Sequence, residues 1–142
     1  MCRLQHHEST KTRKHESLSG VHRFEELSAR IIGAGLAVHQ ALGPGFLESI
    51  YHEAMKVALV NRSIHFHSQV SVEASFEGVI VGRSRIDLSV GNQVVLELKA
   101  VERLRDVHFA QLRSYLRVAR LRVGLLLNFN APTLTIKRVV LD

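Results

Sequence analysis

The sequence predicts a single α+β domain in which helices flank a mixed β-sheet, in the element order ααβββαββ. Its 142 residues match the length of one domain. Two stretches with a helical period are followed by strand-like runs, and a further helix then separates two later strands. A helix between two strands favours a mixed sheet with helices packed against it. With 46% hydrophobic and 23% charged residues, the composition is that of a globular protein.

The first part of the fold is predicted to be two helices. Between His22 and Leu42, apolar residues recur at steps of three and four, which is the period of an amphipathic helix. Gly43-Pro44-Gly45 ends it, and a second helix is expected from Phe46 to about Asn61. This second helix is apolar on most sides, which predicts that it is sandwiched between other elements. Glu48 would then project from a largely buried helix, where a carboxylate needs a partner.

The remaining elements are expected to be five strands and one helix. Three strand-like runs come first, at Ile64–Phe76, Val79–Val90 and Val94–Ala100. A helix from Val107 to about Ala119, with Asp106 as its N-cap, is followed by strands at Val123–Phe129 and Leu134–Val140.

The segment from Met1 to Gly20 is polar and lacks an apolar period, which predicts a disordered basic tail and leaves residues 21–142 as the folded domain. The one cysteine, Cys2, excludes an internal disulfide and favours a reducing compartment. No apolar run approaches the roughly 18–20 residues of a membrane helix, and a signal-peptide core is missing. We expect a cytoplasmic protein with no membrane partner, and the sequence is compatible with a homodimer.

Charged side chains gather on two of the predicted strands. Asp87 lies on the first, and Glu97 and Lys99 lie on the second. Because side chains alternate between the faces of a strand, Glu97 and Lys99 share one face while Leu96 and Leu98 take the other. Both strands are therefore two-sided, with an apolar face and a polar face.

The register of these two strands follows from their apolar faces. A slip of one residue would expose leucine side chains to water, so the apolar residues of both strands must lie on the same side of the sheet. That condition requires a three-residue loop, Gly91-Asn92-Gln93. The apolar pairs it predicts are Val90 with Val94, Leu88 with Leu96, and Ile86 with Leu98. Asp87 then lies opposite Glu97, and Arg85 lies opposite Lys99.

This placement predicts a site for phosphodiester chemistry. Opposed Cβ atoms lie about 4.5–5.5 Å apart, so the carboxylates of Asp87 and Glu97 can share one divalent cation, Mg²⁺ or Mn²⁺. A bound cation polarises a phosphate and activates water. Without a cation, the adjacent charges are expected to raise the pKa of one carboxylate. Lys99, beside two carboxylates, is expected to keep its charge and to orient water or neutralise charge on the phosphate, rather than to act as a base.

The formal net charge is +6, and residues 99–122 account for +5 of it, with seven basic residues against Glu102 and Asp106. The basic residues are Lys99, Arg103, Arg105, Arg113, Arg117, Arg120 and Arg122. A basic surface beside a carboxylate cluster is expected of a protein that binds a polyanion such as nucleic acid. On the helix in this segment, His108, Gln111 and Tyr115 are predicted to face inward, and three of the arginines outward.

These residues also resemble a known family. Gly45-Phe46-Leu47-Glu48-Ser49-Ile50-Tyr51 matches the signature of the GxxExxY proteins, a bacterial group in the PD-(D/E)XK nuclease-like superfamily. Further matches are the surroundings of Asp87, Val95–Ala100, Val107–Leu112 with Tyr115, and Gly124–Phe129. The similarity spans about residues 24–140. One departure is that Arg85-Ile86 precede Asp87, where the superfamily name has proline.

The resemblance implies a restriction-endonuclease-like fold and a set of catalytic residues. In such nucleases the metal, Mg²⁺ or Mn²⁺, is bound by residues corresponding to Asp87, Glu97 and the backbone carbonyl of Leu98. Glu48 would join a second metal or hold a water, and Gln111 would position the substrate or Lys99. Tyr51, His108 and Tyr115 are expected to support the site.

Three functions remain open from the sequence. The first is a Mg²⁺-dependent nuclease acting on nucleic acid, with DNA as the expected substrate. The second is a catalytically silent nucleic-acid-binding or interaction module on the same fold, guided by the basic segment. The third is a solvated ladder of charges formed by Asp87, Glu97, Lys99 and Arg85, without a bound cation.

Overall fold

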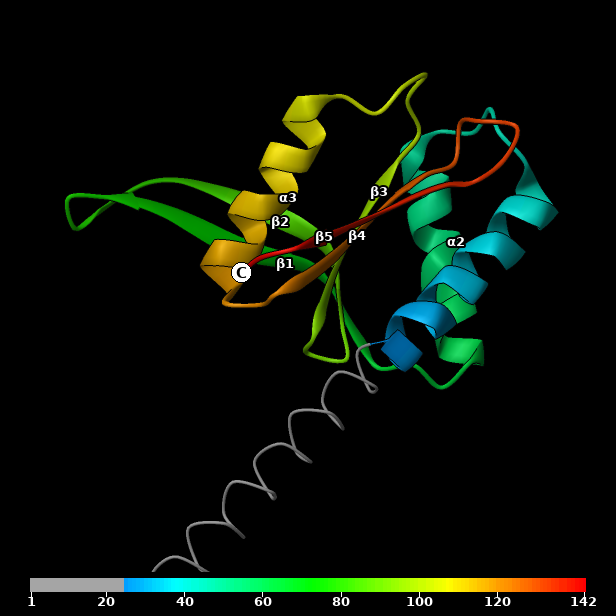
Figure 1. Cartoon of the computed structure of the whole chain (residues 1–142), viewed down its shortest axis with the longest axis horizontal. Helices are drawn as coiled ribbons and strands as arrows, with labels where there is room; N and C mark the ends of the chain where they lie inside the picture. The colour runs from blue at the N-terminus through cyan, green and yellow to red at the C-terminus, as the bar shows by residue number, and fades with distance from the viewer. Residues whose placement is uncertain (1–24) are drawn as a thin grey trace, which may run out of the picture.

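The computed structural model describes residues 25–142, so the predicted tail over residues 1–20 lies outside the described residues (Figure 1). A helix over residues 25–42, here called the leading helix, opens the described region. The elements that follow are α2 (Glu48–Asn61), β1 (Phe66–Phe76), β2 (Val79–Val90), β3 (Val94–Lys99), α3 (Asp106–Ala119), β4 (Val123–Asn128) and β5 (Thr135–Val140). The predicted order ααβββαββ is confirmed.

The five strands form one mixed sheet in the order β1-β2-β3-β4-β5. β3 and β4 are parallel, and every other neighbouring pair is antiparallel. The parallel pair is joined by α3, because a parallel connection needs a crossover of a dozen or more residues. In Figure 1 the leading helix and α2 lie on one side of the sheet and α3 lies on the other.

Two apolar clusters fill the spaces between these layers. The larger contains Ile31 and Met55 from the helices on one side, with Leu96 from the sheet. The smaller contains Leu112 and Val95 on the α3 side. Since successive residues of a strand face opposite ways, a strand covered on both faces is apolar throughout. This explains why every residue from Val94 to Leu98 is buried, Glu97 included.

The hairpin between β2 and β3 has the predicted register at its closed end. Val90 pairs with Val94 and Leu88 with Leu96. The loop consists of residues 91–93, and Gly91 and Asn92 both adopt positive φ. A hydrogen bond from the N–H of Gln93 to the carbonyl of Val90, 3.1 Å long, closes it.

The predicted extension of this ladder to Ile86 and Leu98 is wrong. The paired residues end at Leu88 and Leu96. Ile86 packs with the cluster under α3, whereas Leu88 packs with the cluster on the opposite face. β2 therefore turns at Asp87. For the same reason Arg85 pairs with Ser71 of β1 and does not lie opposite Lys99 in the ladder.

Two expectations for the helices also need correction. The second helix is not sandwiched, because Ile50, Val57 and Val60 on its outer face are exposed. Asp106 is the first residue of α3 and not its N-cap, a position taken by Arg105. No helix in the described part of the chain has the length and apolar character needed to cross a membrane.

Candidate active site

The site predicted on β2 and β3 lies where the two strands separate. The backbone N–H of Asp87 donates to Glu97 Oε1 over 3.1 Å, and the N–H of Leu98 donates to Asp87 Oδ2 over 2.9 Å. Each carboxylate thus accepts a hydrogen bond from the backbone of the opposite strand, just beyond the last ladder pair. Backbone N–H groups inside a protein need such partners. The local structure therefore places the Asp87 and Glu97 side chains next to each other.

Glu97 is the most perturbed acid in this arrangement. Only 4% of its surface is exposed. Burial and the neighbouring charge of Asp87 together raise the pKa of Glu97 to about 8, and Lys99 only partly opposes them. No ion pair within 4.0 Å involves Glu97 or Asp87 in residues 25–142. The expectation that adjacent charges raise the pKa of one carboxylate is confirmed, and a solvated ladder of charges is excluded because Glu97 is buried.

Lys99 ends β3 beside this pair. Its backbone carbonyl accepts a hydrogen bond of 2.9 Å from the N–H of Phe129, which fixes the end of the strand. Its ammonium nitrogen lies 3.5 Å from Gln111 Oε1 on α3, a long contact. Gln111 is exposed, so the expectation that it faces inward is wrong. The buried face of α3 consists of Leu112, Tyr115 and Leu116.

Glu48 approaches the same place from the first turn of α2. It lines a pocket of about 400 Å³ together with Asp87 and Gln69. Burial raises the pKa of Glu48, with Lys99 acting against this and Asp87 adding to it. Glu48 is therefore within electrostatic reach of the pair. Even so, no three His, Cys, Asp or Glu side chains are gathered as a metal-binding group in residues 25–142.

His52 is a residue of this site that the sequence reasoning did not single out. It is buried on α2, one turn after Glu48, and its Nε2 lies 3.2 Å from the backbone carbonyl oxygen of Asp87. Ser68 Oγ and Gln69 Nε2 are each 3.3 Å from the same nitrogen. A protonated Nε2 donates to the carbonyl, and an unprotonated one accepts from the other two groups. With Nε2 protonated, His52 ties α2 to the bend at Asp87. With Nε2 unprotonated, it ties α2 to Ser68 and Gln69 of β1, beside that bend.

Gln69 was missed as well. It has φ of 53°, the left-handed region, within β1. Its neighbours Ser68 and Val70 pair with Leu88 and Ile86, so Gln69 lies beside the bend at Asp87. A non-glycine residue in this conformation is uncommon and worth inspecting for function. The alternating polar pattern of the strand gave no sign of it.

The three supporting residues hold the surrounding loops and helices. Tyr51 donates a 2.6 Å hydrogen bond to the Gly43 carbonyl and stacks on Phe129 with ring centroids 4.6 Å apart. Tyr115 is hydrogen-bonded through its hydroxyl to Ser84 of β2. His108 Nδ1 accepts a 2.9 Å hydrogen bond from the N–H of Arg105. Burial, together with the charges of Lys99 and Arg105, lowers the pKa of His108, which suits it to this acceptor role.

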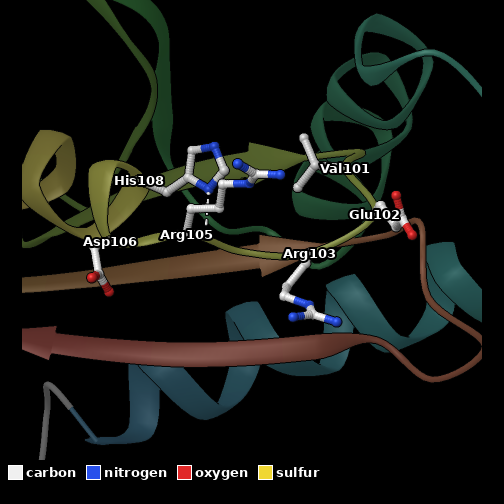
Figure 2. A pocket seen from close by; sticks show the side chains of 6 residues that line it. All are labelled: Val101, Glu102, Arg103, Arg105, Asp106 and His108. Atoms are coloured by element: carbon white, nitrogen blue, oxygen red, sulfur yellow. Dashed lines mark hydrogen bonds between the residues drawn. The ribbon is translucent and has the colours of Figure 1, made fainter.

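A second pocket, of about 750 Å³, lies in the loop after Lys99. Its lining consists of Val101, Glu102, Arg103, Arg105, Asp106 and His108. In Figure 2 the guanidinium groups of Arg103 and Arg105 lie between the carboxylates of Glu102 and Asp106. The pocket therefore has a basic centre and acidic ends, on the side of Lys99 away from the loop of the β2–β3 hairpin.

One of three comparisons with known proteins found a match. A family model described as the PD-(D/E)XK nuclease superfamily matches residues 25–139. A search of curated proteins and a search of solved structures found no match. Because the family match covers most of the chain, the protein belongs to the PD-(D/E)XK nuclease superfamily.

Proposed function

We propose that this protein is a Mg²⁺-dependent nuclease of the GxxExxY group that hydrolyses phosphodiester bonds in DNA. The observation that carries the proposal is the paired carboxylates of Asp87 and Glu97, of which Glu97 is buried and strongly shifted in pKa. A buried carboxylate beside a second, half-buried one needs either a proton or a cation between them. Membership of a nuclease superfamily makes the cation the better explanation.

The residues present fit a hard divalent cation. Asp87 and Glu97 offer carboxylate oxygens from two strands, and we assign the third protein ligand to the backbone carbonyl of Leu98. Oxygen donors of this kind suit Mg²⁺, which keeps several waters and takes few protein ligands. When bound, the cation would polarise the phosphate and lower the pKa of a bound water.

The other side chains would act on the substrate and its water. Lys99 is within electrostatic reach of Glu97 and contacts Gln111, so its ammonium group would face the reacting phosphate. Gln111 would keep the ammonium of Lys99 in place. Among the described residues, Glu48 does not form a metal-binding group of three acids with Asp87 and Glu97. We therefore assign Glu48 to holding a water in the pocket that it shares with Asp87.

The pocket after Lys99 would receive the next part of the nucleic acid backbone. Arg103 and Arg105 face this pocket, and guanidinium groups bind phosphates well. Of the three arginines predicted to face outward, Arg117 and Arg120 are exposed and Arg113 is half-buried. We assign them only a long-range attraction for nucleic acid.

Cleavage assays on purified protein test the proposal. Single- and double-stranded DNA and RNA are incubated with Mg²⁺, Mn²⁺ or EDTA. We expect metal-dependent cleavage of DNA, reduced about 100-fold or more by Asp87→Ala, Glu97→Gln or Lys99→Ala. The matched control is Glu73→Gln, because Glu73 is a carboxylate paired with Arg83 at a distance from the site.

Calorimetry separates metal binding from catalysis. Wild-type protein should bind Mn²⁺, and Asp87→Ala should not, whereas Lys99→Ala should still bind it. Cleavage that survives Asp87→Ala would contradict the proposal. The absence of a three-acid group among residues 25–142 favours one alternative, a catalytically silent nucleic-acid-binding module. That module would bind DNA in a salt-dependent way and cleave nothing.

A further inference from the structure

The outer part of the β1–β2 hairpin extends beyond the rest of the molecule (Figure 1). We call residues 73–83 the arm. Within the arm, β1 and β2 pair only with each other, since β2 meets β3 only from Leu88 onward. The pairs run from Glu73 with Arg83 to Phe76 with Val79 at the tip. A two-stranded hairpin on its own is marginally stable in water, so an arm of this kind gains from a partner.

The tip of the arm is apolar on both of its faces. Phe76, Val79, Ile80 and Val81 are all largely exposed. Three of these residues are consecutive, so neither face of the strand is polar there. Contiguous exposed apolar residues mark interaction sites.

The charge of the arm argues against nucleic acid as that partner. Glu73 and Glu77 against Arg83 give the arm a net charge of −1. Glu73 and Arg83 are also paired with each other, with 3.4 Å between their oxygen and nitrogen. The arm would therefore repel a polyanion or have no electrostatic attraction for it. The chemistry of the tip suits a protein surface with an apolar hollow.

The same molecule carries such a hollow at the base of the arm. A cavity of about 230 Å³ lies between the arm and α3, and its apolar wall comes from Val72, Ala74, Tyr115 and Val118. One face of the molecule thus bears both an apolar projection and an apolar recess. A two-fold axis brings a single patch against itself, so a patch with both features is complementary to its own copy.

The two edge strands of the sheet differ in how they are protected from pairing with another molecule. β5 is short and carries Lys137 and Arg138, which are common protection against strand pairing between molecules. β1 is 11 residues long and contains neither lysine nor proline. Its pairing with β2 shifts register between Ala74 and Ser75, and such irregularities also protect an edge. A contact of the arm with a second copy would therefore be made by side chains.

We propose that the arm docks against a second copy of this chain about a two-fold axis, with each apolar tip in the recess between the arm and α3 of the other copy. This dimer does not depend on nuclease activity. The interface would include Phe76 and Val79–Val81 as the projection and Val118 as part of the recess.

Sedimentation of the full chain under reducing conditions tests the dimer and excludes a disulfide through Cys2. We expect twice the mass of one chain. The double variant Val79→Lys with Val81→Lys should weaken the dimer at least about tenfold, because it places charge in an apolar contact. The control is Val57→Lys with Val60→Lys on α2, where exposure is 60% and 63%, against 62% and 65% for Val79 and Val81. Circular dichroism establishes that both variants fold.

Several results would overturn the proposal. These are a monomeric wild type, an arm variant that keeps the wild-type mass, or equal dissociation by the control variant. A folded arm variant that loses DNA affinity at unchanged mass would assign the arm to nucleic acid instead. Loss of the dimer on removal of residues 1–24, with the arm variant unaffected, would place the interface elsewhere. An unchanged dimer in Asp87→Ala would separate this proposal from the catalytic one.

Discussion

At one end of β2, Leu88–Val90 pair with β1 on one side and β3 on the other, whereas at the other end Val79–Ser84 pair with β1 alone. The first group is buried or half-buried, and the second is exposed throughout. Asp87 lies at the boundary between them. The same strand therefore contributes to the core at one end and to the proposed interface at the other.

The difference between the two ends explains where the site lies. Inside a continuous sheet, the backbone N–H groups donate to the carbonyl groups of neighbouring strands. No N–H group is then left to donate a hydrogen bond to a carboxylate. Where β2 leaves β3, the N–H groups of Asp87 and Leu98 become available, and the two carboxylates accept from them. The pocket beside Glu48 lies next to this point, with Asp87 in its lining. The acidic pair is thus a consequence of the sheet opening at this point.

The largest expected effect contrasts the two ends of β2 directly. Leu88→Ala removes a fully buried side chain from the larger apolar cluster, and we expect it to lower the free energy of unfolding by about 2–5 kcal/mol. Val81→Ala changes an exposed side chain and should cost under about 0.5 kcal/mol. Urea unfolding, at a protein concentration at which sedimentation gives the mass of one chain, measures both. Equal losses would mean that the arm is packed against something in the monomer.

The second effect concerns pH. Glu97 has a pKa of about 8 in the folded protein and an ordinary value of 4.5 when unfolded, so between these values the folded state holds a proton that the unfolded state lacks. Stability contributed in this way is fully present below about pH 4.5 and is lost as pH rises through about 8. We expect Glu97→Gln, which resembles the protonated acid, to be more stable than wild type at pH 8 by on the order of 4 kcal/mol.

Unfolding midpoints of wild type and Glu97→Gln, recorded in EDTA across this pH range, give the comparison. The difference between the two curves isolates the contribution of Glu97 from those of the other titratable groups in the chain. Wild-type affinity for Mn²⁺ should rise over the same range, because metal and proton compete for the site. Two parallel curves would show that the carboxylate of Glu97 is ionised at neutral pH without a metal.

The smallest effect tests the tie between α2 and the bend in β2. His52→Ala should reduce both Mn²⁺ affinity and kcat/KM by about tenfold, since residues that orient metal ligands typically contribute this much. His52→Gln should recover part of the loss through its amide. His39→Ala is the matched control, because His39 also joins a helix to a backbone carbonyl, that of Ala131 over 2.8 Å.

An unchanged metal affinity in His52→Ala, or an equal loss in His39→Ala, would show that His52 contributes only to general stability. Both histidine variants should lower the unfolding midpoint, because each loses a hydrogen bond between side chain and backbone. His52→Ala also loses the contacts with Ser68 and Gln69.

Local pattern was enough to predict much of the fold. The range of β2 and the pairs of Val90 with Val94 and Leu88 with Leu96 followed from alternation alone. They did so because a slip in register would expose leucines to water. That exposure is unfavourable however the neighbouring elements are arranged. The positions of α3, β4 and β5 followed from their periods in the same way, within about one residue at each end.

Where the prediction failed, the determining contact came from elsewhere in the chain. Ile86 continues the apolar alternation of β2, but α3 offers it a place on the opposite face. The apolar outer face of α2 gave no indication of whether another element covers it. Gln111 was assigned to the inner face of α3 from helical angles alone, although Leu112 and Leu116 occupy that face.

The sequence by itself determined the elements, the closed end of the β2–β3 hairpin, and the strands on which Asp87, Glu97 and Lys99 lie, because all of these depend on short-range periodicity and on keeping apolar side chains out of water. Only the tertiary structure decided that the sheet opens at Asp87, that Glu97 is buried beside it, and that His52 reaches the Asp87 carbonyl from 35 residues away. These features depend on how the layers pack over each strand, and no local pattern of residues encodes that packing.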